Sequence, residues 1–166
     1  MRLSIRRATE DDAPGIVEVL NPLIEAGTFT TMAGPVALDD QIEFIRNFPA
    51  RGVFHVAVCE ASGRILGLQD VMPLAVAAAC AHVGAISSFV ALDAHGQGIG
   101  RRLSEVTFEA ARERGFSKIS ATIRADNPRA VAFYLGQGFR IIGTAQRHAL
   151  VRGQYIDEVL AERFLT

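Results

Sequence analysis

The sequence has few of the features that would place a protein at a membrane, on a nucleic acid or around a metal ion. Only Cys59 and Cys80 occur in 166 residues, too few for a disulfide framework or a cysteine-based metal centre. No apolar run reaches the roughly 18 residues of a membrane-spanning helix, and acidic residues from Glu10 onward come too early for a secretory signal. The formal net charge of −1 attracts neither nucleic acid nor an anionic lipid surface. We therefore expect a cytoplasmic protein that binds no metal, nucleic acid or membrane.

What is present is the composition of an ordinary folded domain. Hydrophobic residues make up 49% of the chain and charged residues 21%, which excludes a disordered protein. No repeat, linker or low-complexity segment divides the sequence. Residues 1–166 are therefore predicted to form a single domain.

Hydrophobic periodicity predicts a mixed α/β (α+β) fold, with a central sheet of about six to seven strands and four helices. A strand–helix–strand unit from about residue 85 to residue 124 requires its two strands to be parallel. Strands are expected at 3–9, 52–60, 63–76, 81–92, 116–124, 139–150 and 153–165, and helices from Thr9, at 40–48, 98–115 and 127–138. The first helix presents the apolar stripe Ile16, Val19, Leu20, Leu23 and Ile24.

Three glycines, Gly96, Gly98 and Gly100, alternate between the end of a strand and the start of a helix. Without Cβ atoms, successive backbone N–H groups there can converge on an anion, and the helix start adds partial positive charge. This arrangement is typical of a phosphate site, to which Arg101 could add a charged bond. No Lys-Ser/Thr follows Gly100, so a triphosphate P-loop is not expected. The alternative is a tight turn that only lets the helix pack on the strand.

Two linked motifs make residues 83–139 resemble the GNAT acetyltransferase superfamily. His95-Gly96-Gln97-Gly98-Ile99-Gly100 is similar to the family loop Arg/Gln-x-x-Gly-x-Gly/Ala, with His95 in the first place. The pattern Asn-x-x-Ala-x-x-Phe-Tyr-x-x-x-Gly-Phe is matched from Asn127 to Phe139. The carboxyl-terminal residues 143–165 resemble the subgroup of small-amine and amino-acid N-acetyltransferases that includes phosphinothricin acetyltransferase.

The resemblance implies a GNAT fold in which two parallel strands splay apart and hold acetyl-CoA as co-substrate between them. Tyr134 would protonate the departing CoA thiolate, and a backbone N–H near Val90 would polarise the thioester carbonyl. Tyr134 could instead be a core aromatic residue, and Asn127 only a helix cap. The implied cofactor-binding residues are Ser88, Phe89, Val90, His95, Gly96, Gln97, Gly98, Ile99, Gly100, Arg101, Asn127 and Tyr134.

The resemblance further implies that the acceptor is the primary amine of a small molecule, an amino acid or an analogue of one. Its expected contacts are Phe29, Thr30, Met72 and His82. A general base is not identified, because Ala85 stands where phosphinothricin acetyltransferase relatives place a glutamate. His82 on the same strand is one candidate, and the others are Glu158, Asp157 and Glu25. The resemblance also implies a homodimer.

Two other functions stay open at this level. The acceptor could be a protein N-terminus or lysine, or Ala85 could mark a non-catalytic acyl-CoA-binding module. In either case the glycine segment, Gly96 to Gly100, leads to the same prediction. Gly98→Val should abolish cofactor binding and leave the fold nearly intact.

Overall fold

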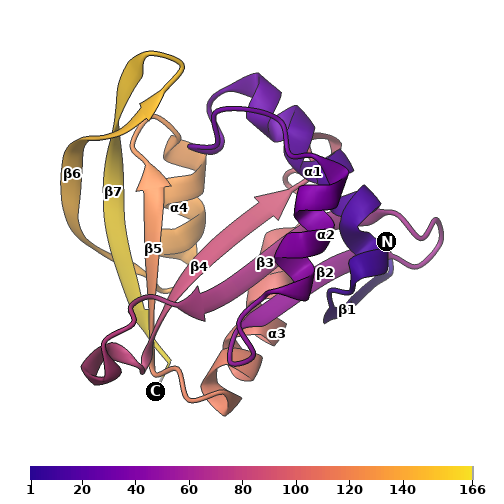
Figure 1. Ribbon diagram of the computed structural model, residues 1–166, viewed down its shortest axis with the longest axis horizontal. Coiled ribbons are helices and arrows are strands. Elements are labelled where there is room, and N and C mark those ends of the chain that lie inside the picture. The colour runs from indigo at the N-terminus through magenta and orange to yellow at the C-terminus, as the bar shows by residue number, and fades with distance from the viewer. Residues whose placement is uncertain (166) are drawn as a thin grey trace.

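The computed structural model describes residues 1–165, and over that range one seven-stranded sheet carries four α-helices (Figure 1). The strands lie side by side in the order β1-β2-β3-β4-β5-β7-β6. Their bounds are β1 Leu3–Arg7, β2 Val53–Cys59, β3 Ile65–Pro73, β4 Val83–Val90, β5 Lys118–Arg124, β6 Arg140–Val151 and β7 Gln154–Phe164. The helices are α1 Ala13–Ala26, α2 Leu38–Arg46, α3 Ile99–Glu113 and α4 Pro128–Gly136.

The pairing of β4 with β5 is the feature that creates space for a ligand. It is parallel, as the crossover argument predicts, whereas every other neighbouring pair is antiparallel. Only three residue pairs join the two strands, from Val83↔Lys118 to Ala85↔Ser120. Beyond that point the strands diverge, and the gap between them widens toward the end of β4 (Figure 1). The predicted fold class, with a splayed parallel pair, is confirmed.

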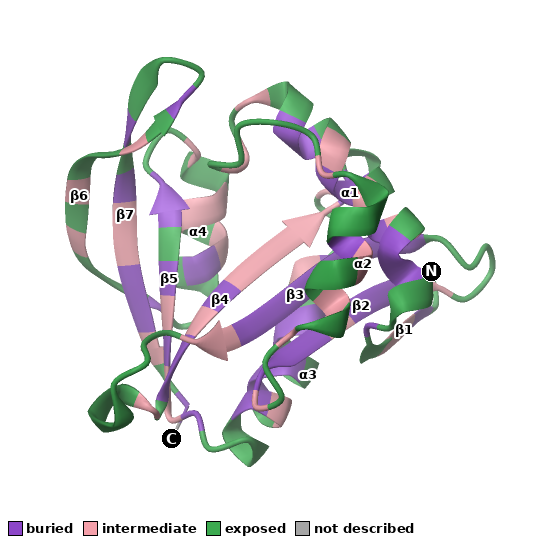
Figure 2. Ribbon diagram, viewed as in Figure 1, coloured by how far each residue is buried: buried purple, intermediate pink, exposed green. Residues whose placement is uncertain are grey.

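Helices cover both faces of the sheet, and β2 and β3 between them are mostly buried (Figure 2). On one face, α1 packs against β3 and against α2. Its predicted apolar stripe, from Ile16 to Ile24, is buried. On the other face, α3 packs against β2 and β3. Phe108 of α3 and Tyr134 of α4 join Phe116 and Phe139 in a second apolar cluster. Helices therefore lie on both sides of the sheet at the gap between β4 and β5.

The first two helices differ in their boundaries from the sequence-based prediction. The first helix begins at Ala13, after a 3-10 turn at Glu10–Asp12, because the Thr9 N–H donates to the Asp12 carboxylate at 2.8 Å. Arg6 also binds this carboxylate. The second helix runs two residues earlier than expected and ends before Phe48, whose ring packs on Phe54 at 5.2 Å between centroids.

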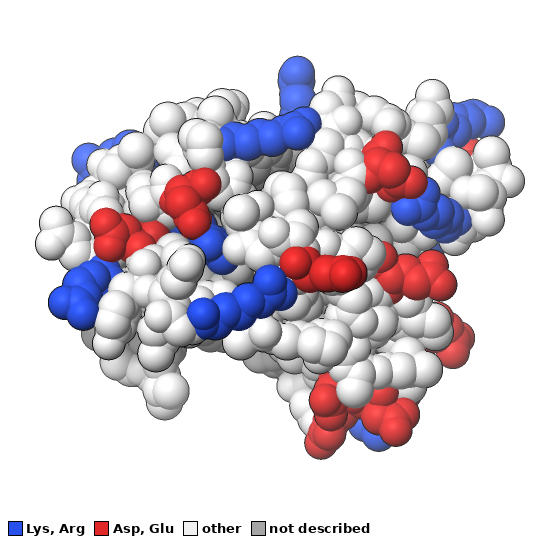
Figure 3. Space-filling model, turned by 90° about the horizontal axis from the view of Figure 1, so that it is seen from above, with Lys and Arg blue, Asp and Glu red and all other residues white. Residues whose placement is uncertain are grey.

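Charges of both signs are interspersed over the face of the molecule seen from above (Figure 3). Several of them form ion pairs, including Arg64 with Asp93 and Arg124 with Asp126. Within residues 1–165, none of the helices is long and apolar enough to cross a lipid bilayer.

Candidate active site

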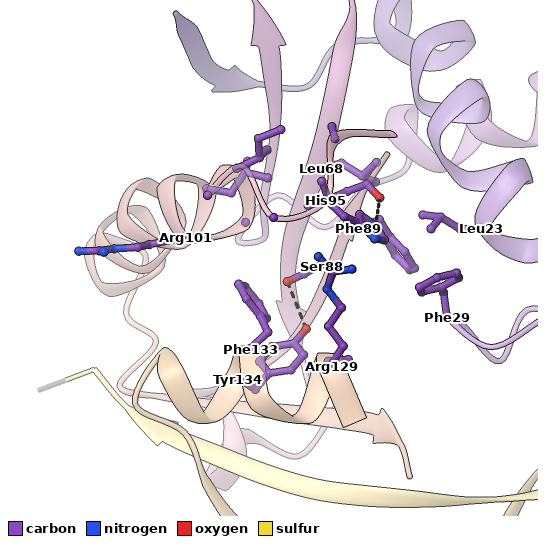
Figure 4. A pocket seen from close by; sticks show the side chains of 18 of the residues that line it. Leu23, Phe29, Leu68, Ser88, Phe89, His95, Arg101, Arg129, Phe133 and Tyr134 are labelled. Carbon is purple, nitrogen blue, oxygen red and sulfur yellow. Dashed lines mark hydrogen bonds between the residues drawn. The ribbon is translucent and has the colours of Figure 1, made fainter. Parts of the chain in front are cut away.

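A cavity of about 340 Å³, called the first cavity below, lies where β4 leaves β5 (Figure 4). It is bounded by the end of β4, the glycine segment before α3, and α4. Phe29, expected to contact the acceptor, also lines it. Of the residues expected to bind the cofactor, it is lined by Ser88, Phe89, Val90, His95, Gly96, Gly98, Ile99, Gly100, Arg101, Asn127 and Tyr134.

The backbone amides of the glycine segment are free to bind a ligand. From Gly96 onward along the chain, the first backbone N–H with a partner is that of Arg102, which donates to the Gly98 carbonyl at 3.1 Å. Within the described residues, the amides from Gly96 to Arg101 donate to no protein atom. Unpartnered amides at a helix start carry partial positive charge and bind anions. The segment therefore fits a diphosphate.

The glycines of this segment have different structural roles. Gly98, the N-cap of α3, has a left-handed backbone with φ of 76°, and a Cβ atom there would meet no atom within 4 Å. Gly100 lies in the helix, where a Cβ atom would come within 2.9 Å of the Phe133 ring. Gly98 thus allows the left-handed backbone conformation at the start of α3 and leaves the cavity open. Gly100, which lacks a side chain, allows α3 to approach α4 closely.

The strand register directs two further N–H groups of β4 into the gap. The Ala91 N–H donates to the Leu66 carbonyl, and that of Leu74 donates to the Val83 carbonyl. Since hydrogen-bonded and non-hydrogen-bonded pairs alternate in an antiparallel ladder, the N–H groups of Ser88 and Val90 point away from β3. They face the side where β5 has diverged, and so are available to an amide or carbonyl group of a ligand.

A hydrogen-bonded network fixes the phenol of Tyr134 at the inner end of the first cavity. The Tyr134 hydroxyl donates to Ser88 Oγ at 3.1 Å (Figure 4). The buried Gln69 amide donates to the same oxygen at 2.8 Å. Gln69 also donates to Ser104, which donates to the Gly100 carbonyl. Burial raises the pKa of Tyr134 to about 12, and the nearby charge of Asp70 acts in the same direction. The phenol therefore keeps its proton at neutral pH.

Two residues of the family motifs have clear local roles. His95 Nε2 bonds to the Val90 carbonyl at 2.9 Å, and its ring meets that of Phe29 edge-on at 5.5 Å between centroids. It therefore links β4 to the loop after α1. Asn127 caps α4, because its side-chain oxygen accepts from the Ala130 N–H at 3.2 Å. Asn127 also lines the first cavity, so the same residue caps α4 and forms part of the cavity wall.

The cation beside the glycine segment comes from α4. Arg101 pairs with Glu105 at 3.3 Å, and its side chain points away from the first cavity (Figure 4). Arg129 points into the cavity and lies 3.6 Å from the position of a Cβ atom on Gly96. Sequence reasoning missed Arg129, although it lies inside the motif that begins at Asn127. That Arg129 lies across the cavity from the glycine segment is visible only in the folded structure.

A second cavity, of about 370 Å³, lies on the face of the sheet covered by α1 and α2. Leu68 and Phe89 line both cavities, so the two are neighbours across these side chains. Besides them, the second cavity is lined by Leu20, Met32, Val36, Asp40, Gln41, Phe44, Phe54, Asp70, Met72 and Ser87.

The residues expected to contact the acceptor are divided by the structure. Phe29 lines the first cavity and Met72 the second, but Thr30 and His82 line neither. Thr30 offers its carbonyl to Arg124 at 2.9 Å. His82 precedes β4 at the end remote from Val90, where its carbonyl accepts from the Ser117 N–H. Among the other expected residues, Gln97 is exposed, and Glu25, Asp157 and Glu158 line neither cavity.

Asp70 is a titratable group that sequence reasoning placed near the acceptor, in a turn at Asp70 to Met72, but did not name as a base. It lies in the middle of β3, is 6% exposed and pairs in register with Ser87 of β4. Burial raises the pKa of its carboxyl from 3.8 to about 7. Within residues 1–165 its carboxylate has no hydrogen-bond donor or cationic partner. The signal in the sequence was a lone carboxylate in a strand that is otherwise nearly all apolar.

Comparison with known proteins agrees with this architecture. Residues 24–139 match the profile described as "Acetyltransferase (GNAT) family". A phosphinothricin N-acetyltransferase of Streptomyces coelicolor is 24% identical over 163 residues, which cover 97% of this chain and 95% of that protein. The structure superposes with a TM-score of 0.88 on a ribosomal-protein-alanine N-acetyltransferase from Brucella melitensis, 28% identical, over 97% and 99% of the two chains.

A further solved structure shares the fold at lower identity. A GNAT superfamily phosphinothricin acetyltransferase from Sinorhizobium meliloti, in complex with AcCoA, superposes with a TM-score of 0.89 at 21% identity. The match covers 99% of this chain and 89% of that one. The family profile spans more than half of the sequence and includes both glycine-segment and α4 motifs. The chain belongs to the acetyltransferase (GNAT) family.

Proposed function

We propose that the protein transfers the acetyl group of acetyl-CoA to the primary amine of a small molecule, by direct attack while both are bound. The observation that carries this proposal is the row of unpartnered amides from Gly96 to Arg101, which opens into a cavity that ends at Tyr134. The relative from Sinorhizobium meliloti, crystallised with AcCoA, supports the choice of acyl donor.

The residues of the first cavity fit each part of that co-substrate. The glycine-segment amides and Arg129 would hold the diphosphate. The N–H groups of Ser88 and Val90 would pair with the extended pantetheine arm and with the thioester carbonyl, as in the addition of a strand to an open sheet edge. Asn127 would contact the same arm. The thioester would then lie near the phenol of Tyr134.

Tyr134 is the group that would protonate the sulfur. In the reaction the amine nitrogen forms a bond to the carbonyl carbon, and the carbon–sulfur bond breaks with its electron pair going to sulfur. Because the phenol is buried and its pKa is raised to about 12, it carries a proton to give at neutral pH. A thiolate formed without that proton would leave a charge in a mostly apolar slot.

The test is consumption of acetyl-CoA, followed by release of free thiol, across a panel of acceptors. We expect turnover with small primary amines. A peptide that begins with alanine belongs in the panel, because the relative from Brucella melitensis is named for acetylation of a ribosomal protein alanine. Preference for that peptide would establish a protein acceptor instead. Tight CoA binding without turnover of any amine would establish the non-catalytic binding module.

Ser88→Ala should lower kcat about fivefold and change the KM for acetyl-CoA little. It removes the hydroxyl that orients the Tyr134 phenol, and a hydrogen bond of this kind contributes about 1 kcal/mol. Steady-state kinetics at saturating amine measure the effect. Ser88→Thr keeps a hydroxyl and should restore most of the rate. An unchanged kcat in Ser88→Ala would show that this network does not position the acid.

We also propose that the protein is a single-domain, cytoplasmic homodimer. Support for the dimer comes from exposed apolar side chains on the outermost strand pair, Ile141, Ile142 and Leu150 of β6 and Tyr155 of β7. Sedimentation at micromolar concentration tests it, since a monomer there would contradict the proposal.

A further inference from the structure

We propose that the second cavity is the acceptor site, that it takes a primary amine bearing an apolar group and no acid group, and that Asp70 is the base that removes the amine's proton. This inference rests on the proposed function and adds to it the substrate class and the missing base. It departs from the expectation of an amino acid as acceptor.

The position of Asp70 relative to β4 is the first support. Its side chain lies on the same face of the sheet as those of Leu68, Ser87 and Phe89, because Asp70 pairs with Ser87 and Leu68 with Phe89. Ser88 and the Tyr134 phenol lie on the opposite face. An amine bound in the second cavity therefore reaches the thioester from one face of β4, while the acid acts from the other.

The polar groups of the second cavity are the next support. Asp70 and Gln41 are both more than nine-tenths buried, and within residues 1–165 neither side chain has a hydrogen-bond partner. The polar atoms of both side chains keep some accessible surface and line the second cavity, so they are open to hydrogen bonds from a ligand bound there. A carboxylate accepts from an ammonium group, and an amide can accept or donate. The two fit a primary amine.

Charge decides against an acid group on the acceptor. The second cavity is lined by two carboxylates, those of Asp70 and Asp40, and by no lysine, arginine or histidine. Arg124, which reaches the loop after α1, is bound to Asp126. An acceptor carboxylate would lie near the buried Asp70 and the exposed Asp40, with no cation among the lining residues, which is unfavourable. The remaining lining is apolar, from Leu20, Met32, Val36, Phe44, Phe54, Leu68, Met72 and Phe89.

The environment of Asp70 suits it to accept a proton near neutral pH. Burial raises the pKa of its carboxyl to about 7, close to the pH at which a general base is most effective. The titratable groups near it are Asp40 of α2 and Tyr134 of α4, while β2, β4 and α1 present Phe54, Ser87 and Leu20. None of these neighbours is a cation that would lower its pKa.

The proton balance closes with these two residues. Asp70 takes one proton from the ammonium group, and the nitrogen lone pair then forms the bond to the thioester carbonyl carbon. The carbon–sulfur bond breaks, and sulfur receives the phenolic proton of Tyr134. A second proton leaves the nitrogen as the amide forms and restores the phenol, while Asp70 releases its proton to water. The sum is one amide, one thiol and one free proton.

The substrate class is tested with pairs that differ only by a carboxyl group. In each, the wild-type enzyme is given an amine and the corresponding amino acid: 2-phenylethylamine against phenylalanine, and 3-methylbutylamine against leucine. We expect kcat/KM to favour the amine at least tenfold in both pairs. An amino acid used as well as its amine would overturn this inference and leave the proposed function standing. No turnover of any amine or amino acid would overturn both.

The role of Asp70 is tested with Asp70→Asn, and Asp39→Asn on the exposed side of α2 is the matched control. We expect kcat/KM for 2-phenylethylamine to fall about 100-fold at neutral pH in the Asp70 variant alone. In the wild type, kcat/KM should rise with pH through about 7 as the carboxyl ionises, and this limb should disappear in Asp70→Asn. O-Benzylhydroxylamine, which is already neutral at pH 7, should be acetylated equally by both enzymes.

Stability gives an independent readout. Because the folded-state pKa of Asp70 is raised, the stability associated with its protonated form is lost as pH rises through about 7. Asparagine stays neutral, so Asp70→Asn should have a higher Tm than the wild type above pH 7. An equal loss of rate with 2-phenylethylamine and O-benzylhydroxylamine would show that Asp70 only shapes the cavity, and would overturn its assignment as the base.

Discussion

Tyr134→Phe should lower kcat by about 100- to 1,000-fold while leaving the affinity for CoA nearly unchanged. The substitution removes one oxygen atom, the donor that would protonate the CoA sulfur, and keeps the ring that packs at 5.1 Å from both Phe133 and Phe139. General acid catalysis contributes on this scale. Thiol release with a saturating amine measures kcat, and calorimetric titration with CoA measures binding.

The chain provides a matched control for this substitution. Its other tyrosine, Tyr155 on β7, is 57% exposed and contacts neither cavity. Tyr155→Phe should therefore leave kcat unchanged. The two variants also separate the catalytic role of Tyr134 from a structural one. If Tyr134 were only a core residue, Tyr134→Phe would lose about 1 kcal/mol of stability through its bond to Ser88 and keep its rate.

The sequence allowed most of the lining of the first cavity to be predicted, because its signals are local. Glycines at alternate positions, a helix start and an asparagine cap each act within a few residues, so spacing alone indicates their geometry. Arg101 lines the first cavity, as its position in the first turn of α3 suggested, but its side chain pairs with Glu105. Arg129, from another helix, also lines this cavity, and spacing along the chain did not indicate it.

The proposed acceptor site is formed by residues of different strands that lie on the same face of the sheet. Which residues these are depends on the pairing register of the strands, and the register cannot be derived from a single sequence. His82 and Ala85 were considered because the predicted strand 81–92 contains both, but His82 lies before β4 begins at Val83. Asp70 lies on β3, where its pairing with Ser87 brings it to the face that Ala85 also shares. A carboxylate on a neighbouring strand can thus occupy the region that Ala85 leaves without one.

The structure also changes what a substitution at Gly98 should do. The sequence alone predicted that valine there would abolish cofactor binding and leave the fold nearly intact. With φ at 76°, however, any side chain at this position costs about 1–2 kcal/mol of backbone strain, and a β-branched residue costs more. A loss of binding in Gly98→Val would therefore be confounded by a loss of stability. Alanine is the smaller and clearer change.

Gly98→Ala should weaken CoA binding about 10- to 100-fold, because its methyl group would project into the space beside the free amides, where hydrogen bonds to a charged group contribute about 1.5–3 kcal/mol each. Gly63→Ala is the control, since Gly63 has φ of 71° and equally open surroundings but lies in the turn between β2 and β3. Both variants should lose similar stability in urea unfolding. Only Gly98→Ala should lose CoA affinity in calorimetric titration. Equal CoA affinity in the two variants would mean that the glycine serves the turn alone, and that the diphosphate is held elsewhere.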